Sequence, residues 1–150
     1  MMAGTLKVKI EEEIILNNQN YGSKRTLSIA SVAEIYKRIV NVPANGDTTI
    51  ATFAAAVSTS DGAFDVNDVR YIRLTNLDSS NSVNVAMVGA SDNAQFVVPA
   101  GGSLMFGTPD DFMLGETDTS PAFSSFEDLA SIIVDSGSNA VDVELFIASV

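Results

Sequence analysis

Apolar and polar residues alternate in short runs along most of this chain. Over residues 5–17, alternate positions are apolar and the positions between them are mostly charged; the apolar set is Leu6, Val8, Ile10, Ile14 and Leu16. A period of two predicts a β-strand. Unbroken, this strand would be about 40 Å long at about 3.3 Å per residue, so we expect either a bulge near Glu12 or an arm that reaches past the domain. The Asn-rich segment 17–23 then predicts a turn into a strand at 26–30, with Leu27 and Ile29 facing inward.

The segment 31–42 fits two interpretations. Its apolar spacing, with Ser31 and Glu34 placed as a capping box, is compatible with a helix, whereas its density of β-branched residues favours a strand. We favour the strand, which the following proline ends. An Asn-Gly-Asp sequence at 45–47 predicts a turn, and the Thr-rich segment 48–53 predicts a further strand.

The order of elements is clearest from residue 69 onward. Four apolar runs separated by turn residues predict strands at 69–76, 83–89, 95–99 and 103–106. The first run is apolar on both faces, as a central strand covered on both sides would be. In the second run, Val83, Val85 and Met87 alternate with Asn84 and Ala86, which indicates one face in water.

The connection 107–130 is too long for an ordinary turn, so we expect a functional loop or a packing arm. Its three phenylalanines, Phe112, Phe123 and Phe126, are expected to pack onto the body, and Phe123, Phe126 and Leu129 to form one helical turn.

After this connection, residues 131–135 and 141–147 predict a closing pair of strands. In the second of these, four apolar residues alternate with other residues: Val141, Val143, Leu145 and Ile147.

These patterns predict an all-β protein. Some eight or more short strands in 150 residues indicate a single antiparallel β-sandwich, jelly-roll-like, with an extended N-terminal arm. We expect the arm or hairpin at residues 1–30 and the sandwich at 31–150. The pattern contains no information on strand order.

The amino-acid composition limits the kinds of catalytic and metal sites that this chain can form. The chain has no His, no Cys and no Trp, so most acid/base, thiol and metal chemistry at neutral pH lacks its usual residues. No disulfide framework is possible, and synthesis in a cytosol is the expected route. Lys7 and Lys9 interrupt the only N-terminal apolar stretch, so we expect no secretory signal and no membrane span, and the mature chain to be the chain as given.

Charge is divided unevenly along the chain. The eight Lys and Arg all precede residue 74, together with eight carboxylates, and eleven carboxylates follow without a base, for a net charge of −11. Such a chain repels phosphate backbones and anionic lipid, so we expect no nucleic-acid partner and no membrane partner. A large net charge also serves solubility alone.

The catalytic templates are missing. The sequence has no Ser-His or Cys-His pair, no nucleophile elbow and no phosphate loop, so we expect no catalytic site and no cofactor. Glycoside hydrolysis uses paired carboxylates, and such pairs occur at Asp110/Asp111 and Glu127/Asp128. Sugar sites also need aromatic platforms, however, and the aromatic residues here are spaced mostly as core.

Two acidic loops are candidates for calcium, which prefers oxygen ligands. One holds Asp61, Asp65, Asn67 and Asp68, and the other holds Asp110, Asp111, Glu116 and Asp118. Neither has EF-hand spacing, and solvated loops that cap turns are the simpler interpretation. We therefore expect no metal and keep the first loop as a weak Ca²⁺ candidate.

The basic residues allow two arrangements. They flank the first hairpin, the segment 31–42 and the central strand: Lys7, Lys9, Lys24, Arg25, Lys37, Arg38, Arg70 and Arg73. In one arrangement they pair within the subunit with Glu11, Glu12, Glu13 and Glu34. In the other, the acid-rich C-terminal half of a neighbouring copy docks against them, a heterologous contact that builds rings or lattices.

The run from Ile35 to Phe106 resembles small β-sandwich virion proteins of tailed bacteriophages, particularly those of marine phages. The matching features are IYKRIVNVPANGDTTIATF from Ile35, the strand-to-turn segment Tyr71 to Asp78, and the Ala-Gly-Gly-Ser turn before a Leu/Phe strand. The terminal segment Ile132 to Ile147 is also similar, as a hairpin, and Leu6 to Leu16 has no counterpart. The resemblance implies a non-enzymatic virion component, and it carries over no functional residues.

From the resemblance we expect a head decoration subunit that assembles in many copies. It would be made in the host cytoplasm, reside in the virion, and bind major capsid or tail proteins and copies of itself. The N-terminal segment would add a strand to a neighbour's sheet edge. Alternatives are a tail or head-to-tail connector component, a carbohydrate- or receptor-binding module that uses the loop 107–130, and an enzyme that uses the carboxylate pairs.

Overall fold

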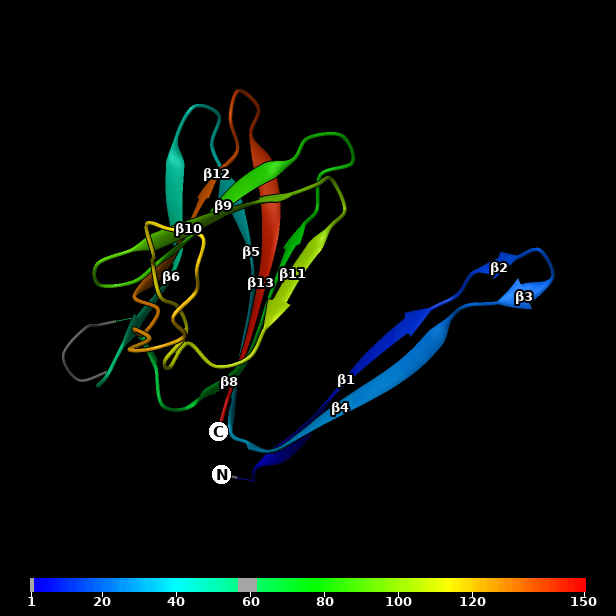
Figure 1. Cartoon of the computed structure of the whole chain (residues 1–150), viewed down its shortest axis with the longest axis horizontal. Coiled ribbons are helices and arrows are strands. Elements are labelled where there is room, and N and C mark those ends of the chain that lie inside the picture. Colours follow the sequence, from blue (N-terminus) through cyan, green and yellow to red (C-terminus); the bar gives the residue numbers. More distant parts are fainter. Residues whose placement is uncertain (1, 57–61) are drawn as a thin grey trace.

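In the part of the chain that the structure describes, the regular elements are all strands. The computed structural model describes residues 2–56 and 62–150 (Figure 1). In chain order the strands are β1 (Gly4–Glu12), β2 (Ile15–Leu16), β3 (Gln19–Asn20), β4 (Ser23–Val32), β5 (Glu34–Val42), β6 (Asp47–Ala54), β7 (Phe64–Asp65), β8 (Val69–Asn76), β9 (Val83–Val88), β10 (Asn93–Val98), β11 (Ser103–Phe106), β12 (Ser131–Asp135) and β13 (Val141–Ser149). The described residues contain no helix of the length and apolarity that crossing a membrane requires.

The body is a jelly roll of two antiparallel sheets. One sheet has the order β11-β8-β13-β5 and the other β10-β9-β12-β6, with the short β7 added in parallel beside β6. The body has eight strands when β7 is left out and β5 is counted as the first. In one sheet the first strand (β5) pairs with the eighth (β13), the eighth with the third (β8), and the third with the sixth (β11). In the second sheet the second strand pairs with the seventh, the seventh with the fourth, and the fourth with the fifth. This is the double Greek key of a jelly roll, so the predicted antiparallel sandwich is confirmed.

The two sheets face each other across one hydrophobic core. The alternation predicted for β13 and β9 is confirmed, since seven inward side chains are at most 1% exposed: Val83, Val85, Met87, Val141, Val143, Leu145 and Ile147. The central strand β8 is covered on its inner face, and on its outer face the predicted cover is present at Tyr71, whereas Arg73 and Thr75 are partly exposed. Ile72 and Leu74 point into the core, and Tyr71 on the opposite face is also buried.

One buried polar side chain joins the sheets at one end of the sandwich. Asn76, the last residue of β8, is fully buried. Its amide nitrogen lies 2.8 Å from the carbonyl oxygen of Asn81, 3.3 Å from that of Val98 and 3.2 Å from that of Pro99. Because Val98 is the last residue of β10 in the opposite sheet, this amide on β8 satisfies a backbone carbonyl of β10 as well as two carbonyls in the adjoining turns.

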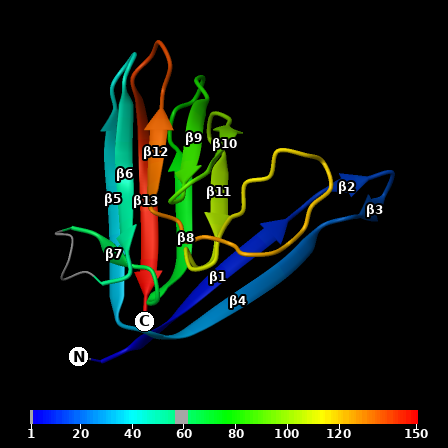
Figure 2. The same ribbon diagram turned by 60° about the vertical axis from the view of Figure 1, so that its left-hand side comes forward.

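The N-terminal segment forms an arm that projects from the body (Figures 1 and 2). Strands β1 and β4 pair with regular register from Leu6 to Glu12, and β2 and β3 continue the hairpin to its tip. At the base, Leu6, Val8 and Ile29 pack on Tyr71, Phe146 and Ala148, beside the buried Val32. This apolar contact attaches the arm to the outer face of the β11-β8-β13-β5 sheet.

Several sequence predictions in this region are settled. The segment 31–42 is a strand where it forms β5, as favoured. Of the two alternatives for the first strand, the arm is right, and the bulge near Glu12 is wrong, because the register shift lies between Gly4 and Leu6. Ser31 adopts a left-handed backbone conformation, φ 60°, where the chain turns from the arm into the body.

The predicted closing pair of strands, at 131–135 and 141–147, is wrong, and so is the terminal hairpin within Ile132 to Ile147. β12 pairs with β6 and β9, whereas β13 pairs with β5 and β8, in the opposite sheet. The intervening turn crosses from one sheet to the other. Two hydrogen bonds hold the turn there. The Ser136 hydroxyl donates to the Pro43 carbonyl at 2.8 Å, and the backbone N–H of Asn45 donates to the Gly137 carbonyl at 2.6 Å.

We expect Leu145→Ala to destabilise the protein strongly, because Leu145 is fully buried between the sheets. The loss of contacts and the resulting cavity cost about 3 kcal/mol of unfolding free energy. The measurement is the midpoint of urea denaturation. The matched control is Leu16→Ala at the arm tip, where 56% of Leu16 is exposed and the change stays within about 0.5 kcal/mol. Equal losses in the two variants would contradict the separation of arm and core.

Candidate functional site

The arm has one apolar face and one polar face. Leu6 lies opposite Ile29, Val8 opposite Leu27, and Ile10 opposite Arg25, so these side chains share a face. The residues on the other face are polar: Lys7, Lys9, Glu11, Lys24, Thr26 and Ser28. The body covers the apolar face only near the base. Farther out, 43% of Ile10 and 55% of Leu27 are exposed.

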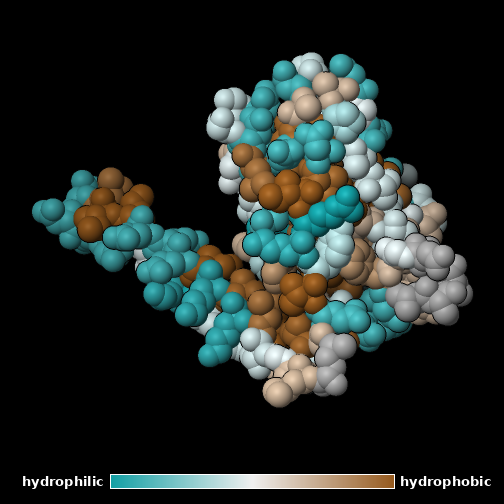
Figure 3. All heavy atoms as spheres, turned by 180° about the vertical axis from the view of Figure 1, so that it is seen from behind, coloured by the Kyte–Doolittle hydropathy of each residue, from teal (hydrophilic) through white to brown (hydrophobic). Residues whose placement is uncertain are grey.

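The tip of the arm carries a second group of exposed apolar side chains. Ile14, Ile15, Leu16 and Tyr21 are 53%, 69%, 56% and 61% exposed. A two-residue turn joins β2 to β3, and both of its residues are asparagines with positive φ, 50° and 61°, as a type I′ hairpin requires. In Figure 3 this group is a hydrophobic patch at the end of the arm. We call these four residues the tip.

Glycine is required where the tip joins the arm. A Cβ on Gly22 would lie 2.1 Å from the carbonyl oxygen of Glu12, so only glycine allows the two strands to pass this closely. The acidic run Glu11 to Glu13 immediately precedes Ile14, the first residue of the tip.

An open groove of about 430 Å³ lies between the arm and the body. Its lining comes from β1, β4, β8, β11 and the residue after β11: Val8, Ile10, Arg25, Thr26, Leu27, Arg70, Tyr71, Met105, Phe106 and Gly107. Most of these residues are apolar, and Figure 3 shows hydrophobic surface that continues from the arm into the body at this place. We call this the groove.

The groove has cationic residues and no anionic ones in its lining. Among the described residues, only three cations have a carboxylate within 4.0 Å: Lys24 with Glu11, and Lys37 and Arg73 with Glu144. The arrangement in which all basic residues pair within the subunit with Glu11, Glu12, Glu13 and Glu34 is thus realised only at Lys24. Arg70 donates instead to the backbone carbonyls of Asn67 at 2.6 Å and Val69 at 3.1 Å.

The outer face of the β11-β8-β13-β5 sheet carries a charged network beyond the arm base. Arg73 donates to Glu144 at 2.5 Å, Lys37 lies 3.7 Å from Glu144, and the Arg73 guanidinium lies 5.8 Å from the centre of the Phe146 ring. The hydrogen bond from Arg73, aided by the charges of Arg73 and Lys37, holds the pKa of Glu144 below its usual value. The positive charges of Arg73 and Lys37 thus balance the negative charge of Glu144 next to the arm base.

The calcium candidates of the first acidic loop are placed as follows. Asp61 lies outside the described residues. Asp65 accepts the backbone N–H of Asn67 at 2.8 Å and so caps the turn before β8, and the Asp68 carbonyl accepts the N–H of Val150 at 2.9 Å. The prediction for Asp61, Asp65, Asn67 and Asp68 stays a prediction.

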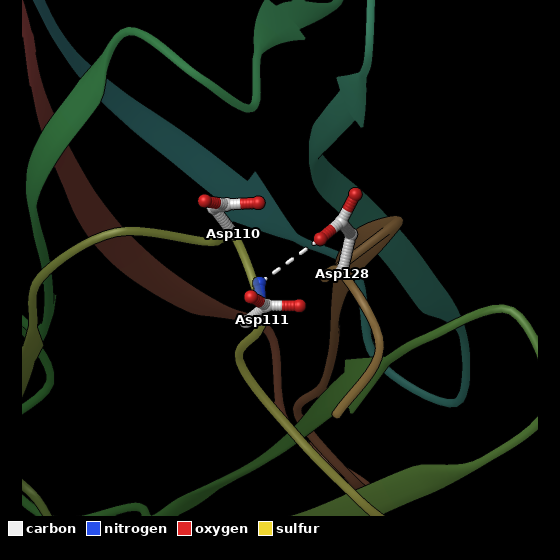
Figure 4. Close-up of side chains that lie close together, drawn as sticks. All are labelled: Asp110, Asp111 and Asp128. Carbon is white, nitrogen blue, oxygen red and sulfur yellow. Dashed lines mark hydrogen bonds between the residues drawn. The ribbon is translucent and has the colours of Figure 1, made fainter. Parts of the chain in front are cut away.

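The structure brings together a different set of carboxylates, Asp110, Asp111 and Asp128 (Figure 4). One oxygen from each lies within 4.8 Å of the others, and all three residues are exposed. The backbone N–H of Asp111 donates to Asp128 at 2.9 Å. Desolvation, followed by the charges of Asp111 and Asp128, raises the pKa of Asp110 above its usual value.

The other carboxylates that the sequence grouped here serve the backbone. Glu116 accepts the N–H of Ala122 at 2.9 Å, and Asp118 accepts the N–H of Ser120 at 2.8 Å. Glu127 accepts the N–H groups of Ser91 and Asp92, both at 3.0 Å. The Glu127/Asp128 pair is therefore divided, with Glu127 capping the turn after β9 and Asp128 facing Asp111.

The connection 107–130 packs onto the body only in part. Phe112 contacts Phe106, with ring centres 5.1 Å apart, but 75% of Phe123 and 40% of Phe126 are exposed. The predicted helical turn is wrong, because Phe123 and Ser125 have positive φ, 55° and 58°, which a right-handed helix does not allow.

Sequence reasoning missed the groove and the position of Asp128. The groove needs residues from β1, β4, β8 and β11, which no local pattern connects. The exposed tip left a weak signal, since Ile14, Ile15 and Leu16 are three consecutive apolar residues that break the alternation. Both faces of the hairpin are apolar at that point.

No protein-family model and no curated protein matches this chain. Among solved structures, one described by the words "Bacillus endospore appendages form a novel family of disulfide-linked pili" is similar over 77% of this chain and 85% of that chain, with 12% sequence identity and a TM-score of 0.42. At that TM-score the similarity supports no conclusion about the fold or function of this chain.

We expect Asp110→Asn to raise the melting temperature at pH 7. Because the pKa of Asp110 is raised in the folded protein, the folded chain holds this proton more tightly than the unfolded chain does. Its stabilising contribution is complete below the unfolded pKa of about 3.9 and is lost as pH rises through the folded pKa. The gain from Asp110→Asn should therefore shrink at pH 3. Glu13→Gln, on the distant arm, is the control. If Asp110→Asn raised the melting temperature equally at pH 7 and pH 3, the raised pKa of Asp110 could not be the reason.

We expect the melting temperature to be the same with excess calcium and with excess chelator, because the Asp65 carboxylate already accepts the backbone N–H of Asn67. Calorimetric scans in both conditions test this. A fall with chelator that Ca²⁺ reverses, and that Asp65→Asn abolishes, would instead establish the calcium site.

Proposed function

We propose that this chain is a non-enzymatic structural subunit of a tailed-phage virion, present in many copies as a head decoration protein. The observation that carries the proposal is the arm, whose outer apolar face and tip are left uncovered by the described part of the chain. Exposed apolar surface of this kind marks contact with another protein.

The body suits a scaffold role. A jelly roll is an architecture that viral coat proteins use, and lectins share it, so it agrees with the proposal without deciding it. The phage context comes from the resemblance of the run Ile35 to Phe106. The absence of His and Cys favours a binding role over a catalytic one.

The net charge of −11 favours the outer capsid surface. A subunit placed against packaged DNA would experience like-charge repulsion, whereas one on the outside of the head would not. The proposed partners are major capsid or tail proteins and further copies of this chain, joined in the virion after synthesis in the host cytoplasm. A tail or head-to-tail connector position has the same physical requirements and is the alternative place.

The arm offers two kinds of contact to a partner. Its apolar face and tip can bury side chains, and in the described residues β1 and β4 pair only with each other, so each has an outer edge open to strand addition. The contact at the arm base holds these groups away from the body in a defined direction.

A second function, carbohydrate or receptor binding, is favoured by one observation. Phe123 lies on the connection 107–130 with 75% of its surface exposed, and an exposed ring can stack on a sugar. A glycan array with the wild-type protein and with Phe123→Ser tests this function separately.

We expect an arm-shortened variant to be lost from virions. Because Ile10 and Arg25 are register partners, residues 11–24 can be replaced by Asn-Gly, which closes a two-residue hairpin between them and keeps the base contacts. The measurement is the number of copies per particle, by quantitative mass spectrometry of purified virions made in cells that supply only the variant.

Phe123→Ser is the matched control, and it should be incorporated at the wild-type level. Full occupancy by the arm-shortened variant, once its melting temperature shows a folded body, would refute the role of the arm.

A further inference from the structure

Two surfaces in the described part of the chain complement each other in shape. The tip is a projecting apolar group formed by Ile14, Ile15, Leu16 and Tyr21. The groove is mostly apolar, and its lining includes Tyr71, Met105 and Phe106 from the body and Val8 and Leu27 from the arm. Its volume of about 430 Å³ has room for several side chains.

The tip cannot occupy the groove of its own chain. The groove begins where the arm leaves the body, and the tip lies at the far end of the arm (Figure 1). The five steps along the chain from Ile10 to Ile15 span roughly 17 Å when extended, and folding this segment back would break the regular pairing of β1 with β4. The geometry thus excludes the tip of the same chain from the groove and leaves the groove open to the tip of another copy.

The charges beside the two surfaces are opposite. Arg25 and Arg70 line the groove, and in the described residues neither has a carboxylate within 4.0 Å. Glu11, Glu12 and Glu13 directly precede the tip. Glu11 is paired with Lys24 and Glu12 accepts the Ser23 hydroxyl at 2.6 Å, whereas Glu13 has no ion pair within the described part of the chain. An acid-flanked tip therefore matches a cation-flanked groove.

We propose that the tip of one copy of this chain docks into the groove of the next. The contact joins different surfaces on the two copies, so it is heterologous and generates a closed ring or an open row of subunits. This inference rests on the proposed function and names one partner, a second copy of this chain. A different virion protein in the groove is the competing outcome.

The experiment compares full-length variants by sedimentation velocity over a wide range of concentration. Ile15→Asp places a charge in the tip, and Met105→Asp places one in the groove; these residues are 69% and 43% exposed, so both variants should keep the fold, which their melting temperatures check. Val97→Asp is the control, because Val97 is 68% exposed on β10, in the other sheet.

We expect the wild-type protein and Val97→Asp to associate with rising concentration. Each of the other two variants alone should associate at least about tenfold more weakly. An equimolar mixture of Ile15→Asp and Met105→Asp should form dimers and nothing larger, since the one intact tip meets the one intact groove. Arg25→Glu should weaken association as a second groove variant, and adding Glu13→Arg to it should restore association.

Three results would overturn the tip-to-groove contact: a wild-type protein that stays monomeric, an Ile15→Asp protein that assembles normally, or a mixture that stays monomeric. If the wild type is monomeric but the arm-shortened variant is missing from virions, the arm binds another virion protein and only this inference fails. If the wild type assembles as expected but the shortened variant enters virions at full occupancy, the proposed function fails and the contact between copies stands.

Discussion

The packing of the arm base on the outer face of the sandwich is the contact on which the rest depends. A two-stranded ribbon is at best marginally stable in water by itself. Here Leu6, Val8 and Ile29 pack on Tyr71 and its neighbours Phe146 and Ala148, so the ribbon shares apolar surface with a sheet that the jelly roll already holds rigid. This contact sets the direction of the arm, and with it the position of the tip and the width of the groove.

The same contact explains why β8 carries the buried Tyr71 on its outer face as well as apolar residues on its inner face. Ile72 and Leu74 complete the core between the sheets, while Tyr71 on the other face supports the arm. The body is otherwise self-contained, with its core residues drawn from β5 to β13 and the connections between them. Arm and body can therefore be altered separately, which suits a protein in which one part provides stability and the other provides contact.

Exposed apolar surface at the tip and in the groove has a cost in solubility, which the charge distribution offsets. The carboxylates that follow residue 74 cover the body, and those on the long connection largely cap turns, as Glu116, Asp118 and Glu127 do. The cations instead lie along the arm, on β5 and on β8, where Arg70 lines the groove. Like-charged bodies repel, so association is directed to the places where apolar surface and opposite charge coincide.

Alternation along the sequence determined which side chains of β9 and β13 enter the core, because the period of two depends only on the chain itself, whereas the strand at 31–42 was indicated by its β-branched residues. Alternation could not determine which strands pair. The apolar face of β12 and that of β13 are buried in the same core from opposite sheets, so their pattern is the same as that of a hairpin, and the predicted pair was wrong. The groove and the grouping of Asp128 with Asp110 and Asp111 were also decided only by tertiary structure, since each joins residues from separate segments whose distances depend on how the sheets pack.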